Sequence, residues 1–261
     1  MQTLIRNIGY LLLNKLLSVR SKLKVLLVYH SIGCDIPQAV DQQTFKRQVQ
    51  FLKEKFDEIV TVGNLINKSS DSKNLVAVTF DDGCRNVLEH AVPALEDENV
   101  NATFYFPTKY LGKKFELGGK KLPVMAPSEV SELSDLGHEI GSHSVSHRRL
   151  INLSSDEIQF ELSRSKKTLE QITGTRVTSF AYPEGRYNES VIKYLKESSY
   201  RTAVTTEEML YDQSRGAFQI PRVSINQQLN HTAFSVKTSS ALPVLNQIKQ
   251  VTEQFNHYEF F

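Results

Sequence analysis

The sequence of 261 residues has no tryptophan, only two cysteines and only three methionines. Cys34 and Cys84 alone are too few for a disulfide framework or a cysteine metal cluster, so we interpret them as free thiols of a reducing compartment. An excess of either charge is also missing, because 31 Lys and Arg balance 29 Asp and Glu. A net charge of +2 gives no reason to expect nucleic acid, and we predict no such partner.

Long apolar runs are missing as well, and the first 24 residues are the one compositional anomaly of the chain. Its core, Ile8 to Leu13, falls far short of the ~20 residues with which a helix crosses a bilayer. Basic residues without acidic partners flank an apolar stripe at helical spacing. We therefore predict a basic amphipathic helix over residues 1–24, followed by one large domain over residues 25–261.

Three roles stay open for residues 1–24: an interfacial helix that makes peripheral contact with a membrane, a helix that packs on the domain, and an export signal. The export signal is less favoured, because no small-residue cleavage site follows and a strand begins near Lys24. We therefore expect the chain in the cytoplasm or at the surface of the cytoplasmic membrane.

Beyond this segment, apolar β-rich runs alternate with helical patterns. Such alternation predicts parallel β/α units, and the length suits an α/β fold in the form of a distorted (β/α) barrel of about seven strands. The predicted strands are 24–29, 75–80, 102–106, 137–142, 179–182, 201–205 and 218–225. The predicted helices are 42–56, 87–98, 128–136, 154–173, 188–198 and 242–255, and residues 109–127 are predicted to form a long surface loop.

Ionisable residues concentrate where predicted strands end, which is where barrel enzymes place their catalytic groups. Asp81 and Asp82 directly follow a buried strand, and two adjacent carboxylates raise one another's pKa unless a cation or a division of roles relieves them. In an extended backbone they point to opposite sides, so that one can bind a metal while the other faces a substrate. A surface Asp-Asp-Gly turn is the alternative interpretation.

Two further segments have the same position. His143 and His147 are spaced to lie on one face of a helical turn, and imidazole suits Zn²⁺ and similar ions, although two unrelated surface histidines would give the same pattern. Tyr182-Pro183-Glu184 begins a tight turn after another strand. Such a turn can direct a backbone N–H into a site or have no catalytic role.

In this chain order the three segments, Thr-Phe-Asp-Asp-Gly, His-Ser-x-x-His and Phe-Ala-Tyr-Pro-x-Gly, resemble the motifs of the polysaccharide deacetylase (NodB-homology) family of carbohydrate esterases. The resemblance implies that Asp82, His143 and His147 hold one divalent metal ion, with Zn²⁺ expected and Co²⁺ or Ni²⁺ as alternatives. It implies Asp81 as the general base, and the backbone N–H around Glu184 as a donor to the oxyanion.

Two departures from the family pattern concern the general acid and the substrate wall. No late Leu-x-His is present, and Tyr29-His30 at the end of the first strand resembles the circularly permuted branch of the family, so we assign the general acid to His30. Glu184 stands where many relatives carry Tyr. Tyr182, Pro183, Glu184 and Arg222 complete the predicted oxyanion and substrate-binding group, with the role of Arg222 left open.

The sequence thus predicts a metal-dependent hydrolase that removes N-acetyl or other N-acyl groups from the amino sugars of a polysaccharide, glycolipid or precursor. A carbohydrate-binding member of the same fold with impaired catalysis is the alternative.

Overall fold

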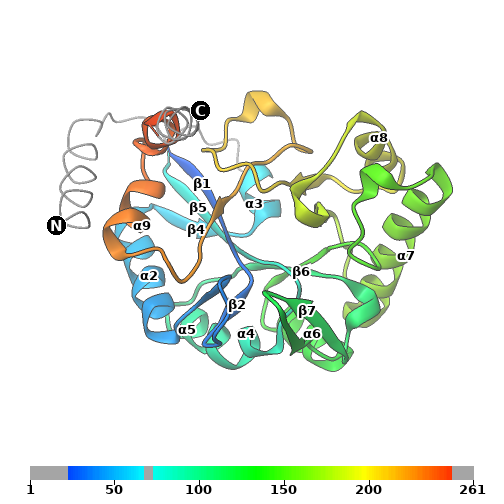
Figure 1. The fold of residues 1–261 in the computed structure, drawn as a ribbon, viewed down its shortest axis with the longest axis horizontal. Coiled ribbons are helices and arrows are strands. Elements are labelled where there is room, and N and C mark those ends of the chain that lie inside the picture. The colour runs from blue at the N-terminus through cyan, green and yellow to red at the C-terminus, as the bar shows by residue number, and fades with distance from the viewer. Residues whose placement is uncertain (1–22, 68–72, 249–261) are drawn as a thin grey trace, which may run out of the picture.

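The computed structural model describes residues 23–67 and 73–248, so the helix predicted over residues 1–24 lies almost entirely outside the described residues (Figure 1). Its last residue, Lys24, is the first residue of a strand. Within the described ranges, no helix is both long and apolar enough to cross a membrane. The strands of the main sheet are β1 (Lys24–Tyr29), β4 (Glu58–Val60), β5 (Leu75–Phe80), β6 (Thr103–Phe106), β9 (Glu139–Ser142), β10 (Ser179–Ala181), β11 (Thr202–Val204) and β12 (Val223–Ser224).

Among the described residues, this sheet is entirely parallel and curls into a distorted barrel, as the sequence predicted. Seven strands follow one another in the order β11-β10-β9-β6-β5-β1-β12, and β4 pairs with β5 beside them. The two ends of this path approach each other through one short segment. Ile220 bridges to Val204 of β11, and Val223 pairs with Leu27 of β1. All the strands therefore present their carboxyl ends at the same side of the molecule.

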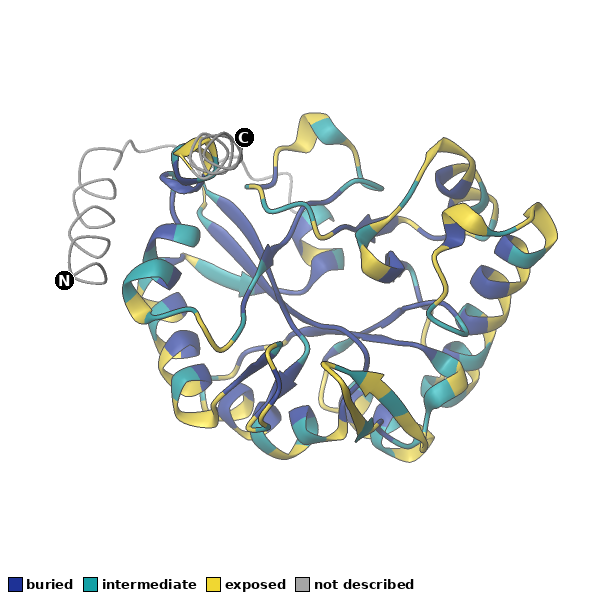
Figure 2. Cartoon of the chain, in the orientation of Figure 1, coloured by how far each residue is buried: buried dark blue, intermediate teal, exposed yellow. Residues whose placement is uncertain are grey.

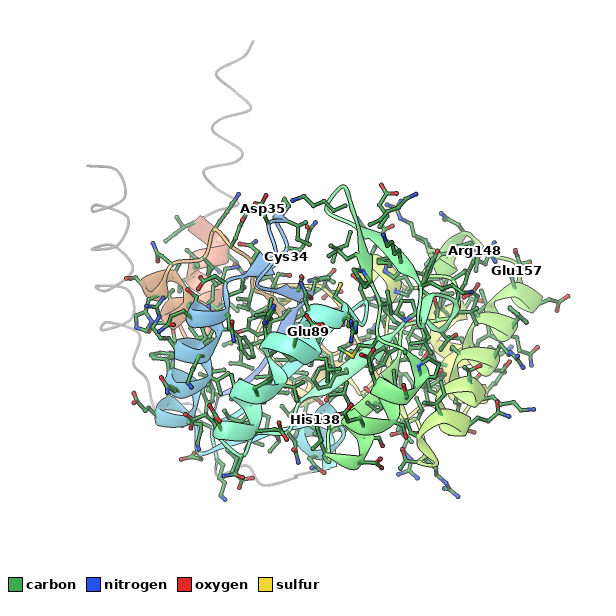
Figure 3. All side chains as sticks on the ribbon, turned by 90° about the horizontal axis from the view of Figure 1, so that it is seen from below. Cys34, Asp35, Glu89, His138, Arg148 and Glu157 are labelled. Atoms are coloured by element: carbon green, nitrogen blue, oxygen red, sulfur yellow. The ribbon has the colours of Figure 1, made fainter. Side chains whose placement is uncertain are left out.

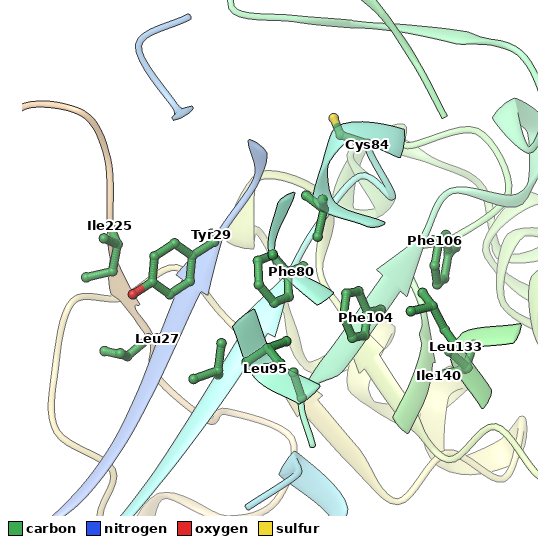
Figure 4. Close-up of a cluster of buried hydrophobic side chains, with 14 of the residues drawn as sticks. Leu27, Tyr29, Phe80, Cys84, Leu95, Phe104, Phe106, Leu133, Ile140 and Ile225 are labelled. Atoms are coloured by element: carbon green, nitrogen blue, oxygen red, sulfur yellow. The ribbon is translucent and has the colours of Figure 1, made fainter. Parts of the chain in front are cut away.

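Five strands of the main sheet, β1, β5, β6, β10 and β11, are buried over their whole length rather than alternating. Every residue of β1 and β5 is buried, which is the pattern of a parallel sheet covered on both faces. Phe80 and Phe104, on neighbouring strands, stack with their ring centroids 4.9 Å apart, and Tyr29 lies 5.6 Å from Phe80 (Figure 4). This apolar layer fixes the strands that position the polar groups at their ends.

Helices surround the sheet and turn their exposed residues outward (Figure 2). Their ends follow local sequence signals: Asp41 and Ser154 cap α2 and α7 with their side chains, and Gly174 ends α7 in the left-handed conformation. The helices are α2 (Gln42–Lys55), α3 (Val62–Asn67), α4 (Arg85–His90), α5 (Val92–Asp97), α6 (Pro127–Asp135), α7 (Ser155–Thr173), α8 (Glu189–Glu197) and α9 (His231–Lys237). Short 3₁₀ turns occur at Thr108–Tyr110, Leu150–Asn152, Pro183–Gly185 and Gln213–Arg215.

The structure corrects several predicted elements. The loop predicted at 109–127 contains the hairpin β7 (Lys114–Leu117) and β8 (Lys120–Pro123), because Gly118 and Gly119 supply a turn with positive φ. The helix predicted at 87–98 is two helices that meet at Ala91, with Pro93 in the first turn of the second.

Other corrections concern short elements. The strand predicted at 218–225 is ordered as a strand only over Val223–Ser224, because the preceding segment crosses to β11. The small pair β2 (Ser31–Ile32) and β3 (Ala39–Val40), and the elements β4, α3 and α9, were not predicted. The predicted closing helix is present over residues 242–248, and the rest of it lies outside the described residues.

Candidate metal and catalytic site

Most of the predicted site residues follow four strands at the carboxyl side of the sheet. His30 follows β1, Asp81 and Asp82 follow β5, His143 follows β9, and Tyr182 follows β10. These strands are parallel and belong to one continuous run, with only β6 between β5 and β9, so their ends lie along the same rim. Figure 3 shows Cys34, which follows β2, and Arg148, which follows β9, toward one end of the molecule, and His138, which precedes β9, toward the other.

Asp81 is held by Arg222. The guanidinium donates to both carboxylate oxygens of Asp81, with N–O distances of 2.7 and 2.6 Å, and also to Thr79 Oγ1 and the carbonyl of Thr205. Burial alone would raise the pKa of Asp81, but the charge and hydrogen bonds of Arg222, together with the nearby His143 and His30, outweigh burial and hold that pKa well below its usual range. Arg222 itself is fully buried over the ring of Tyr105.

These contacts bear on the role of Arg222, which the sequence left open. Its fully buried guanidinium binds the carboxylate of Asp81, and these are the contacts of a residue that positions Asp81. Its assignment to the substrate-binding group stays a prediction. The sequence pattern around Arg222 gave no indication of this partner, because 141 residues separate the two side chains along the chain.

Asp82 is turned away from its neighbour by its backbone. Asp82 and Gly83 have φ angles of 65° and 62°, and a Cβ at Gly83 would lie 2.4 Å from Phe106 Cδ1. Glycine is therefore required at position 83 by both conformation and space. The turn leaves the Asp82 carboxylate facing His143 and His147, with distances from Oδ1 to the two Nε2 atoms of 3.6 and 3.4 Å.

His143 is locked in one orientation. It is buried, and its Nδ1 lies 2.7 Å from the carbonyl oxygen of Ala181. A carbonyl only accepts, so Nδ1 donates its proton and Nε2 keeps the lone pair that faces Asp82. Burial lowers the pKa of His143 to about 3, which keeps the ring neutral and able to bind a metal.

His147 also faces the carboxylate of Asp82, but its backbone conformation differs from the prediction. Residues 143–147 form no helical turn; instead Ser144 and His147 adopt positive φ angles of 65° and 59°, and Ser144 Oγ accepts the N–H of His147 at 3.0 Å. The two imidazole centroids are 4.7 Å apart. His143 and His147 are therefore close together, as predicted, but a folded-back loop brings them together rather than the predicted helical turn.

Glu161 shapes this loop and was not predicted. It lies on α7 with only 1% of its surface exposed, and its carboxylate accepts the N–H groups of Val145 and Ser146, both at 2.8 Å. A signal for it exists in the sequence: Glu161 stands in the apolar stripe of α7, between Ile158 and Leu162. A carboxylate in such a stripe requires buried donors.

The three side chains fit a metal ion. One ligand atom each from Asp82, His143 and His147 can be chosen so that all lie within 4.8 Å of one another. Asp82 Oδ1 is buried and has no hydrogen-bond partner among the described residues. Burial, and then the charge of Asp81, raise the pKa of Asp82 to about 8, so ionised Asp82 needs a cation beside it. One carboxylate and two imidazoles suit a borderline divalent ion.

His30 lies in the same cluster without belonging to this set. It is half-buried; burial lowers its pKa, and the charges of Asp81, Arg222 and His147 all act on it. It therefore lies close enough to Asp81, Arg222 and His147 for their charges to act on it, and its role stays a prediction.

The turn after β10 presents mostly its backbone. Glu184 has a φ of 56°, and its exposed carboxylate pairs with Arg149 at the molecular surface. Tyr182 is buried: its hydroxyl donates to the carbonyl of Phe218 at 3.0 Å and its N–H to that of Val204. The described backbone hydrogen bonds of the Pro183–Gly185 turn use the N–H groups of Gly185 and Arg186 but not that of Glu184.

The chain is similar to known proteins in both sequence and fold. The sequence profile of the family described as polysaccharide deacetylase matches residues 68–203, just over half of the chain. The chain belongs to the polysaccharide deacetylase family. Asp81, Asp82, His143 and His147 all fall within the matched range, whereas His30 and Arg222 lie outside it.

Individual members of the polysaccharide deacetylase family cover most of the chain. YxkH of Bacillus subtilis is 27% identical over 82% of this chain and 76% of its own length. The poly-beta-1,6-N-acetyl-D-glucosamine N-deacetylase of Staphylococcus epidermidis is 23% identical over 72% of this chain and 68% of its own. The structure of Streptococcus pyogenes deacetylase PplD in complex with acetate has a TM-score of 0.72 at 22% identity, covering 84% of this chain and 99% of PplD.

The family resemblance, the barrel fold and the assignment to the deacetylase enzymes are confirmed by these matches. The circular permutation and the roles of individual residues stay predictions.

Proposed function

We propose that this polysaccharide deacetylase is a metal-dependent hydrolase that removes N-acetyl groups from the amino sugars of a polysaccharide, glycolipid or precursor. The observation that carries the proposal is the convergence of Asp82, His143 and His147 within 4.8 Å, directly beside a second, separately held carboxylate. Two buried carboxylates with opposite environments are typical of a site in which one group takes a proton and the other has a separate role.

In this proposal Asp82, His143 and His147 hold one divalent ion, with Zn²⁺ expected and Co²⁺ or Ni²⁺ able to replace it. The ion, when bound, supplies Lewis acidity that lowers the pKa of water and polarises an acyl carbonyl. The hydrogen bond from His143 Nδ1 to Ala181 and the hold of Glu161 on the 144–147 loop keep the two rings in place before the ion binds.

Asp81 is the proposed general base. Arg222 keeps its carboxylate ionised and fixes both oxygens, so Asp81 is ready to take a proton from the attacking water over the whole neutral range. The pairing with Arg222 also distinguishes Asp81 from Asp82, because the carboxylate of Asp82 faces the two histidines instead.

His30 is the proposed general acid and donates a proton to the leaving amine. Its position among Asp81, Arg222 and His147 supports this, and no competing histidine follows a strand end on that side of the site among the described residues. The N–H of Glu184 is the proposed donor to the oxyanion. Its direction is set by the strained backbone of the turn rather than by the side chain.

Acetate release from a panel of N-acetylated mono- and oligosaccharides tests the proposal, with metal content measured on the same samples. We expect chelation to abolish release, and Zn²⁺ or Co²⁺ to restore it. Full activity in the demetallated protein would contradict the metal role. Sugar binding without any acetate release would instead favour a carbohydrate-binding member with impaired catalysis.

A further inference from the structure

A groove on the outer wall of the barrel begins at the rim near the candidate site. It consists of two cavities of about 570 and 730 Å³ that share Thr44, Leu229 and Asn230. The first lies between the loop after β1 and the loop after β12. The second continues between α2 and α9, which lie side by side (Figure 1). From Thr44 to Phe51, seven residues along α2, the groove extends for about 10 Å.

The end of the groove at the rim is lined by residues that directly follow a proposed site residue in the sequence. Gly33 and Cys34 line it, only three and four residues beyond His30. Ser31 ties the two together, because its hydroxyl lies 3.0 Å from Cys34 Sγ and accepts a hydrogen bond from Asn86 on α4.

The β7–β8 hairpin continues the rim on the other side. Phe115 of this hairpin lies 5.1 Å from the ring of His147, and Lys120 pairs at 3.1 Å with Asp35, which lines the groove. One wall therefore extends from a proposed metal ligand to the mouth of the groove. Cys34 and Asp35 are labelled together at this end of the molecule in Figure 3.

The lining of the groove has the chemistry of a sugar site. Exposed amide side chains, Gln227 and Gln228, follow β12 and offer both donors and acceptors to hydroxyl groups. Further along, Arg47 adds a donor, and the half-buried ring of Phe51, with His231 packed edge-on at 5.2 Å, adds an aromatic surface. An apolar face together with a few convergent polar groups is the usual composition of a small-molecule binding site.

We propose that this groove binds the sugar units of a glycan chain that lie beyond the unit being deacetylated. The inference rests on the proposed function and narrows it, because the substrate becomes a chain of several units rather than a single sugar or a short precursor. The groove contributes affinity without touching the reacting groups, since none of its residues belongs to the metal or proton-transfer set.

The test compares a disaccharide and a hexasaccharide of N-acetylglucosamine, in β-1,4 and β-1,6 series, as substrates of the full chain. We expect the wild type to have a lower KM for the hexasaccharide of the preferred series. Arg47→Ala/Gln228→Ala should raise that KM by about 10-fold, the effect of losing one or two hydrogen bonds, and leave kcat and the disaccharide KM unchanged. Lys193→Ala, a change at another exposed position, on α8 away from the groove, is the control.

Calorimetric binding of the hexasaccharide to the same variants gives a readout that does not depend on turnover. A wild type that binds the hexasaccharide but releases no acetate overturns the proposed function. The groove proposal is still tested in that case, because it requires Arg47→Ala/Gln228→Ala to bind the hexasaccharide more weakly than the wild type does. Equal KM and equal affinity for both lengths, or a length preference that survives the double substitution, overturns the groove proposal.

Discussion

The Arg222–Asp81 pair provides a quantitative test of how this site is held together. Both side chains are buried, and two hydrogen bonds of 2.7 and 2.6 Å join them. Arg222→Met keeps an unbranched apolar stem but leaves the carboxylate of Asp81 buried without its partner, and breaking a buried ion pair in this way costs about 3–5 kcal/mol. At roughly 2–4 °C per kcal/mol for a large domain, we expect Tm to fall by on the order of 10 °C.

A double-mutant cycle separates this pairing from a general loss of packing. Arg222→Met/Asp81→Asn leaves no unpaired charge, so its cost should be smaller than the sum of the two single variants by about 2 kcal/mol or more. Urea unfolding followed by far-UV circular dichroism gives the free energies and suits a chain without tryptophan. If the losses in unfolding free energy of the two single variants add up to that of the double variant, or if Arg222→Met alone loses less than about 1 kcal/mol, the buried ion pair does not stabilise the fold as described.

Three further predictions follow from individual contacts. Glu161→Gln removes the carboxylate that holds the 144–147 loop, so metal affinity measured by equilibrium dialysis should fall by about 10-fold without loss of helix content; unchanged affinity would show that the loop does not need it. His30→Gln should keep its metal and lose turnover by on the order of 10²-fold, and undiminished turnover would remove His30 as the acid. Burial lowers the pKa of His138 to about 4, whereas the pKa in the unfolded chain is about 6.5. The folded state therefore disfavours the protonated ring, and the free energy of unfolding, which is unaffected by this group above about pH 6.5, decreases as the pH falls toward 4. Between about pH 7 and about pH 4.5 the wild type should therefore lose about 2 kcal/mol more than His138→Gln in urea unfolding, and equal losses would contradict the assignment.

The sequence predicted the elements whose signals are local. The strands β1 and β5 are continuous apolar runs, and α7 has a capping serine at one end and a glycine at the other, so their limits were predicted to within one residue. Because parallel strands align their carboxyl ends, the motifs after them could also be expected to meet.

The features that the sequence did not predict depend on contacts between distant segments. Nothing near Arg222 or Asp81 in the sequence indicates that they pair, and the fold of the His143–His147 loop depends on Glu161 of a later helix. Residues 218–225 pair first with β11 and then with β1. The hydrophobic pattern of the sequence does not show that a segment changes partner in this way. Sequence motifs thus pointed to the proposed reacting groups, whereas the residues that contact and orient them could be found only in the structure.

Metal content and acetate release, measured together for the wild type, Asp81→Asn and Asp82→Asn, test the central claim that neighbouring carboxylates have separate roles. The account predicts one bound divalent ion in the wild type and in Asp81→Asn, with turnover of Asp81→Asn lower by on the order of 10²–10⁴-fold. It predicts that Asp82→Asn loses both the ion and activity. Equal metal affinity in the two variants, or loss of the ion from Asp81→Asn alone, would contradict it.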